Sequence, residues 1–192
     1  MQKIELKIVG LSYSHSQSSA YALILGELNG NRRLPIIVGG LEAQAIAIEV
    51  EKLKPARPLT HDLFKTFAET FDIEILEVII NKFHEGIFYS ILVCEKNGEI
   101  IEIDSRTSDA VAIALRFNSP IFTYESIMSV GGIILDPEDE TIEQAVKQSV
   151  EENEFSNLSL SELDELLLKA IEHEDYERAS VIRDEITKRK SK

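Results

Sequence analysis

The sequence predicts an α+β domain built from two copies of a β-β-β-α unit, followed by an acidic linker and an α-helical hairpin. Three observations indicate this. Strand and helix patterns alternate over residues 1–135, two parts of that region repeat each other, and negative charge is concentrated after residue 135. We expect a mixed or antiparallel sheet packed with helices. The predicted domains are residues 1–135, the linker 136–157 and the hairpin 158–190.

Strand patterns dominate the beginning of the chain. Met1–Val9 alternates apolar and charged residues with the period of two that a half-buried strand shows. Ala20–Leu25 and Arg33–Val38 are two further predicted strands. Asn29-Gly30 between them predicts a two-residue hairpin turn, because both residue types tolerate a positive φ. The serine-rich segment Leu11–Ser19 is expected to be a polar loop.

Two helices are expected next. Leu41–Leu53 has a helical pattern that Pro55 and Pro58 end, because proline disrupts a helix interior. Thr60 is then a candidate N-cap for a helix over His61–Phe71.

The second part of the domain repeats this order. We predict three strands joined by turns at His84–Gly86 and Asn97-Gly98, then a helix capped by Thr107 or Ser105 and a short closing strand. The predicted strands are Ile73–Ile80, Phe88–Glu95, Glu99–Asp104 and Pro120–Tyr124, and the helix runs from Ser108 to about Phe117.

The two halves also resemble each other residue by residue. Glu27–Gly30 matches Glu95–Gly98, and Glu42–Ile48 matches Asp109–Leu115 with four of seven positions identical. An internal duplication would place the first residues of the second match, both acids, in the first turns of equivalent helices. Two interpretations stay open: the acids complement the helix dipoles, or they converge on one cleft.

Composition excludes several classes of protein. The 192 residues carry a net charge of −14, which disfavours a general role in coating nucleic acid. Cys94 has no cysteine partner, no segment is long and apolar enough to span a membrane, and no signal peptide is evident, so we expect a cytoplasmic protein. Phosphate-binding loops, dinucleotide fingerprints, zinc-protease motifs and serine-hydrolase motifs are all missing from the sequence.

Two polar clusters precede the predicted helices and contain the candidate site. Phosphodiester cleavage needs a proton-transfer group, a cation near the phosphate and, in many enzymes, carboxylates that hold a divalent metal. The alternative is structural, with Arg–Asp pairs bracing the starts of both helices. The hypothesis assigns proton transfer to His61 and metal or water positioning to Asp62, Asp104 and Asp109. Arg57 and Arg106 would contact the phosphate, and Glu42 would have a weaker part. The metal would be Mg²⁺ or Mn²⁺, with no organic cofactor.

Three motifs in order resemble the bifunctional nuclease family over roughly residues 1–135. They are Gly40-Leu-Glu-Ala43, Arg57-Pro-Leu-Thr-His-Asp-Leu63 and Asp104-Ser-Arg-Thr-Ser-Asp-Ala110. The resemblance implies a nuclease that acts on both DNA and RNA, and we expect a homo-oligomer, a dimer. Thr107 stands where the family often has proline, a change expected to affect the start of the helix more than the chemistry.

The C-terminal region resembles the UVR motif, a helical hairpin through which excision-repair nuclease subunits bind each other. Ser159 and Glu162 form a predicted capping box. The resemblance lies in Glu174–Ala179 and Ile182–Ile186, with Ser180 where alanine is usual. It implies a protein partner bound through residues 158–190. The competing interpretation of the whole chain is a non-enzymatic oligomeric binding or regulatory module that acts through this hairpin.

The apolar positions of the two hairpin helices follow helical spacing. Two helices this short should pack against each other and seek a further partner. The expected apolar face comprises Leu160, Leu163, Leu167, Ala170 and Ile171 on the first helix, and Tyr176, Ala179, Ile182, Arg183 and Ile186 continue it on the second.

Overall fold

A computed structural model describes residues 2–13, 20–134, 159–172 and 176–190 and confirms the α+β prediction. The order of three strands followed by a helix occurs twice, as the internal repeat predicted. The first unit consists of β1 (Lys3–Tyr13), β2 (Ala20–Glu27), β3 (Arg32–Gly39) and α1 (Gly40–Val50). The second unit consists of β4 (Glu74–His84), β5 (Ile87–Lys96), β6 (Glu99–Arg106) and α3 (Thr107–Phe117). Helix α2 (Thr60–Thr70) lies between the two units in sequence.

One sheet contains both units. Within the described residues it has eight strands in the order β6-β5-β4-β7-β1-β2-β3-β8. Strand β7 (Ile121–Tyr124) pairs antiparallel with β1 and parallel with β4, so it joins the two units into one mixed sheet. Helix α4 (Glu125–Gly131) and strand β8 (Ile133–Ile134) complete the domain and were not predicted from the sequence.

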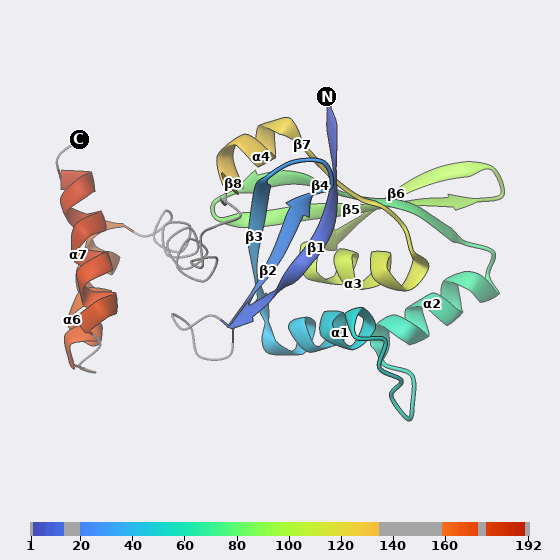
Figure 1. Ribbon diagram of the computed structural model, residues 1–192, viewed down its shortest axis with the longest axis horizontal. Coiled ribbons are helices and arrows are strands. Elements are labelled where there is room, and N and C mark those ends of the chain that lie inside the picture. Colours follow the sequence, from blue (N-terminus) through green and yellow to red (C-terminus); the bar gives the residue numbers. More distant parts are fainter. Residues whose placement is uncertain (1, 14–19, 135–158, 173–175, 191–192) are drawn as a thin grey trace.

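The repeated alanine-rich segments form the contact between the helices. Figure 1 shows α1, α2 and α3 together, with α4 apart from them, and Met128 of α4 is buried in the same core as α1 and α3. Ala43 and Ile46 of α1 and Ala110 and Ala114 of α3 are buried in the same core. Small side chains let α1 and α3 approach closely, so the first turns of the two equivalent helices lie near each other.

One predicted turn is confirmed and another is wrong. Asn97 and Gly98 have φ of 55° and 83°, as a two-residue hairpin turn requires. Asn29 and Gly30 belong instead to a longer connection, and neither has a positive φ. The Arg32 guanidinium donates to the Glu27 carboxylate at 2.6 Å across the base of this connection, which explains how a wider loop is held.

The predicted caps were displaced by one residue or more. Thr60 is not the N-cap but the first residue of α2, which Leu59 precedes as N-cap. Arg106 is the N-cap of α3 in place of Ser105 or Thr107, without a side-chain capping bond. Thr107 occupies the first helical position of α3, where proline is also favourable.

The Thr107 hydroxyl is also used structurally. It accepts a hydrogen bond from buried Ser90 at 2.9 Å and donates one to the Phe88 carbonyl at 3.0 Å, so it fastens the start of α3 to β5. Strand β1 extends to Tyr13, so the beginning of the predicted polar loop is strand; residues 14–19 lie outside the described residues.

The C-terminal helices form a hairpin, described here by itself. They are α6 (Leu160–Glu172) and α7 (Tyr176–Lys190), and Leu163 and Ile182 are fully buried between them. The capping box is present, because the Glu162 carboxylate accepts the Ser159 N–H at 2.7 Å. Ala170, Ala179 and Ile186 are also buried and Leu167 partly so, as predicted, whereas Leu160 is exposed at 39% and Arg183 is exposed. The linker 136–157, the turn 173–175 and the side chains of Ile171 and Tyr176 lie outside the described residues.

Arg116 ties the three helices of the domain together. Its side chain is 2% exposed and donates to Asp62 of α2 at 2.5 Å. The same guanidinium donates to the Ala45 carbonyl of α1 and the Ala112 carbonyl of α3. The hydrogen bonds compensate the cost of burying a charge.

We predict that Arg116→Met lowers the free energy of unfolding by about 3 kcal/mol, because removing one partner of a buried ion pair leaves the other uncompensated. Urea denaturation measures the change. Arg57→Met is the control: Arg57 is exposed and makes no hydrogen bond or ion pair to the described residues, so its replacement should change stability by less than about 0.5 kcal/mol. Equal stability of the two variants would contradict this role of Arg116.

Candidate active site

The candidate site lies where the first turns of three helices meet. Glu42 is the third residue of α1, His61 the second of α2 and Asp109 the third of α3. Arg106, the N-cap of α3, contacts both acids. The two equivalent acids of the repeat therefore converge on one guanidinium, although Glu42 lines the adjoining cavity and Asp109 does not.

Four side chains form a continuous chain of contacts. Arg106 Nε donates to Asp109 Oδ2 at 2.7 Å, and its NH1 nitrogen donates to Glu42 Oε1 at 3.0 Å. The other oxygen of Asp109, Oδ1, lies 3.1 Å from Nε2 of His61. One carboxylate thus holds an imidazole with one oxygen and a guanidinium with the other.

The protonation state of Asp109 decides how His61 is oriented. Burial raises the pKa of Asp109, but hydrogen bonds from Arg106 and His61 outweigh burial, and the net pKa is lowered. Because an ionised carboxylate only accepts hydrogen bonds, Nε2 of His61 must be the donor. A neutral imidazole then carries its free lone pair on Nδ1, which makes no hydrogen bond to the described residues.

Arg106 is held in place while its charge stays accessible. Its hydrogen bond to Asp109 is the main cause that raises its pKa, so the guanidinium is permanently charged. The side chain is nevertheless 67% exposed. Its second terminal nitrogen makes no hydrogen bond to the described part of the chain and is available for an anion.

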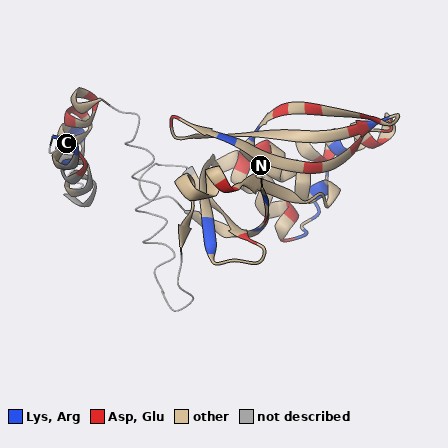
Figure 2. Ribbon diagram, turned by 90° about the horizontal axis from the view of Figure 1, so that it is seen from above, with Lys and Arg blue, Asp and Glu red and all other residues tan. Residues whose placement is uncertain are grey.

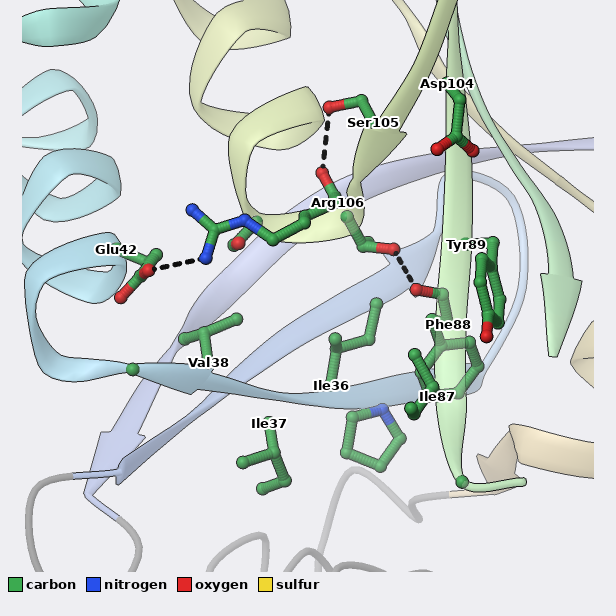
Figure 3. Close-up of a pocket in the computed structure, with 15 residues that line it drawn as sticks. Ile36, Ile37, Val38, Glu42, Ile87, Phe88, Tyr89, Asp104, Ser105 and Arg106 are labelled. Carbon is green, nitrogen blue, oxygen red and sulfur yellow. Dashed lines mark hydrogen bonds and ion pairs between the residues drawn. The ribbon is translucent and has the colours of Figure 1, made fainter. Parts of the chain in front are cut away.

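A cavity of about 480 Å³ adjoins Arg106 and Glu42, as Figure 3 shows. Its walls come from the end of β3, the start of β5 and the end of β6, including Asp104. His61 and Asp109 do not line this cavity; they adjoin it through Arg106. A ligand in the cavity would therefore lie against Arg106 and Glu42 and not against His61 or Asp109.

Gly39, the N-cap of α1, is the position in the first repeat that corresponds to Arg106. A Cβ built at Gly39 would lie 2.5 Å from Oε2 of Glu42. Glycine therefore leaves the space in which the Glu42 carboxylate reaches across to α3. Larger residues would displace that carboxylate from Arg106.

The other predicted site residues are not part of the four-residue cluster. Asp62 binds Arg116 and accepts the Leu59 N–H at 2.8 Å. Burial raises its pKa, but these contacts outweigh burial and the net pKa is lowered. Asp104 lines the cavity, is exposed and has no hydrogen-bond partner among the described residues. Arg57 belongs neither to the four-residue cluster nor to the lining of the cavity.

The described residues contain no group of three His, Cys, Asp or Glu side chains placed to hold a metal ion. Asp109 and Asp62 are each engaged by an arginine, whereas Asp104 is unpartnered among the described residues. These three acids therefore do not fit as ligands of one ion in this arrangement. The expectation of Mg²⁺ or Mn²⁺ stays a prediction.

Sequence reasoning did not identify Arg116, which positions α2 and thereby His61. A signal was present, because Arg116 is the one cation in the apolar segment from Ala110 to Phe117. A lone arginine in such a helix requires buried acceptors, and Asp62 supplies one.

Comparison with known proteins places the chain in a family. Residues 23–136 match the family described as the bifunctional nuclease domain. The chain belongs to the bifunctional nuclease domain family. All four residues of the cluster lie within the matched region, and residues 157–191 match the UvrB/UvrC motif. Both resemblances predicted from the sequence are confirmed.

Two relatives of this nuclease-domain protein come from Mycobacterium tuberculosis. They are "Uncharacterized protein MT1877" of strain CDC 1551 / Oshkosh and "Uncharacterized protein Rv1829" of strain ATCC 25618 / H37Rv. Each is 39% identical to this chain over 145 residues, covering 75% of this chain and 86% of the relative.

No helix within the described residues is long and apolar enough to cross a membrane.

We predict that Asp109→Asn reduces the loss of stability of this domain at acid pH. The folded-state pKa of Asp109 lies below its ordinary value of 3.8, so the carboxylate stabilises the fold above that pH. This contribution is lost as the pH falls through 3.8 and then through the lower folded-state pKa. Urea denaturation between about pH 6 and pH 3 should show a smaller decline for the variant.

The matched control for this titration is Asp104→Asn. Asp104 makes no hydrogen bond or ion pair to the described residues, so its variant should follow the wild-type pH dependence. A decline as steep in Asp109→Asn as in wild type would contradict the stabilising role of the Asp109 carboxylate.

Proposed function

We propose that this protein hydrolyses phosphodiester bonds of DNA and RNA at the cluster of His61, Asp109, Arg106 and Glu42. The observation that carries the proposal is that the two oxygens of Asp109 hold a potential base and an exposed cation side by side. Membership in the bifunctional nuclease domain family supports the same reaction class.

In the proposed mechanism His61 is the general base. Asp109 keeps Nε2 protonated, so Nδ1 accepts a proton from the attacking water. As the oxygen of that water bonds to phosphorus, the bond from phosphorus to the leaving sugar oxygen breaks, and the leaving oxygen takes a proton from solvent. Arg106 contacts the scissile phosphate and stabilises the negative charge that grows on its oxygens as the water attacks. Glu42 holds the guanidinium from the other side and is a positioning residue.

The remaining predicted residues have supporting roles in this proposal. Asp62 positions α2 through Arg116, and Arg57 contributes a cation to a longer nucleic-acid strand. A divalent metal would supply further charge for the phosphate, and the reaction proposed for His61 and Arg106 includes no step through it.

We expect the purified protein to cleave circular DNA and single-stranded RNA, and His61→Ala to lower the rate about 100-fold or more, as loss of a general base does. Arg106→Lys should also lower the rate, because lysine cannot contact Asp109, Glu42 and a phosphate at once. Gel electrophoresis of the products measures the rates. Reactions with EDTA and with added Mg²⁺ or Mn²⁺ test the metal prediction separately.

His84→Ala is the matched control, since His84 is exposed at the end of β4 and outside the cluster. Its cleavage rate should equal that of wild type. A contaminating nuclease would cleave equally in all preparations. Equal rates for wild type, His84→Ala and His61→Ala would therefore exclude the proposed active site.

The distribution of charge favours a second candidate, a non-enzymatic binding module. Figure 2 shows acidic and basic residues interspersed over the described part of the chain, without a continuous basic stripe. Helix α2 also exposes the apolar side chains Leu63, Phe67 and Phe71 at spacings of four residues. An apolar face of this kind is typical of protein contact surfaces. Cleavage by wild type but not by His61→Ala would favour the nuclease over this alternative.

We further propose that the hairpin binds a protein partner and that the protein assembles as a homo-oligomer, a dimer. The match to the UvrB/UvrC motif supports an interaction role for residues 157–191. Leu168 of α6 is 63% exposed, so it offers an apolar contact to a partner. A second copy of the hairpin would bury it.

We predict that the full-length protein sediments as a dimer and that Leu168→Glu sediments as a monomer, because a charge in an apolar interface is costly. Sedimentation velocity measures the difference. Glu165→Gln, also exposed on α6, is the control and should remain a dimer. A dimer that persists in Leu168→Glu would place the interface outside this hairpin.

A further inference from the structure

We propose that the cavity beside Arg106 binds one unpaired nucleotide, with its base near Tyr89 and Asp104 and its phosphate at Arg106. This inference rests on the proposed nuclease function and specifies its substrate as single-stranded nucleic acid. Three observations support this inference: the cavity itself, the residues at its two ends and the pairing of β5 with β6.

The size and lining of the cavity suit a nucleoside. Its volume of about 480 Å³ falls within the range of about 300–1,000 Å³ that small-molecule sites occupy. Ile36, Val38 and Phe88 give it an apolar wall, and polar groups lie at its ends. Apolar walls with few polar groups are what the faces and edges of a base require.

The base end is defined by strand register. Tyr89 is the direct partner of Arg106, and Asp104 is the partner of Ile91, so Tyr89 and Asp104 are diagonal neighbours on one face. Figure 3 shows Asp104 above Tyr89 on one side of the cavity and Glu42 with Arg106 on the other. A base of one nucleotide can therefore contact Tyr89 while its phosphate contacts Arg106.

Tyr89 also lies beside a cation. The Lys82 ammonium lies 4.9 Å from the centre of the Tyr89 ring. Lys82, Tyr89 and Arg106 follow one another across β4, β5 and β6 in the register of the sheet. Sites that bind single strands combine aromatic side chains for base stacking with cations for the phosphate backbone.

Asp104 gives the base end a chemical preference. Its carboxylate lines the cavity, is exposed and has no hydrogen-bond partner among the described residues. A carboxylate accepts hydrogen bonds from the exocyclic amino group of cytosine. Thymine has no such amino group, so cytosine should bind more tightly than thymine.

A paired base cannot occupy the cavity. In a duplex the base edges are paired and the faces are stacked, so one base would first have to leave the helix, which costs free energy. Single strands avoid that cost. The site therefore selects single-stranded regions, including loops of RNA and locally opened DNA.

Fluorescence anisotropy with labelled 12-nucleotide oligomers tests this inference. The His61→Ala protein is used so that cleavage cannot interfere, and dC12, dT12 and a duplex of mixed sequence are the probes. We expect dC12 to bind more tightly than dT12 and dT12 to bind at least about tenfold more tightly than the duplex. Tyr89→Leu in this background should weaken dC12 binding at least about fivefold, as loss of one stacked base does.

Two matched variants complete the binding experiment. Tyr89→Phe keeps the ring and should bind dC12 within about twofold of its parent, and Asp104→Asn should remove the preference for dC12 over dT12. Equal binding of single strand and duplex, or no effect of Tyr89→Leu, would overturn the inference. Cleavage by wild type is measured separately, so the binding result can be interpreted even when the protein cleaves no nucleic acid.

A crosslinking measurement makes the test independent of how well the Tyr89 and Asp104 variants fold. A 12-nucleotide oligomer with one 5-iodouridine is irradiated on the His61→Ala protein, and the crosslinked peptide is identified by mass spectrometry. We expect the crosslink on the segment Gly86–Tyr89 or Asp104–Ser108, which line the cavity. Crosslinks confined to other segments would overturn the proposed site.

Discussion

The contact of one guanidinium with two acids organises this protein. Arg106 bridges Asp109 of its own helix and Glu42 of the equivalent helix in the other repeat. Both acids stand in the first turn of a helix, where the dipole favours negative charge. The bridge therefore joins the starts of α1 and α3 and holds an exposed cation beside the cavity. His61 joins this arrangement through the second oxygen of Asp109.

The fold that surrounds this bridge serves to bring separate segments together. Strand β7 connects the two three-stranded units, and alanine residues let α1 and α3 approach. Buried Arg116 then fixes α2 against both helices, which places His61 beside Asp109. Residue 42, residue 61 and the pair 106 and 109 come from three segments distant in sequence, and the packing of three helices makes them neighbours.

Local patterns predicted much of the fold because they depend on neighbouring residues. The alternation in β1, the Asn97-Gly98 turn and the internal repeat were all readable from the sequence. The Asn29-Gly30 turn was mispredicted, because the tertiary pair of Glu27 with Arg32 accompanies a wider loop. In the site, residue types indicated His61, Arg106, Asp109 and Glu42. Which aspartate faces an arginine depends on packing, so the separation of Asp62 and Asp104 from the cluster was not predictable.

The two equivalent N-caps differ in residue type, and this difference decides whether either repeat unit could form the site alone. Gly39 provides only space, whereas its counterpart Arg106 provides the positive charge. A fragment that ended after α2 would retain Glu42 with no cation to neutralise it. The complementary fragment would retain Arg106 and Asp109 without His61. Neither half can therefore form the bridge on its own, because it needs Glu42 from one unit and Arg106 from the other.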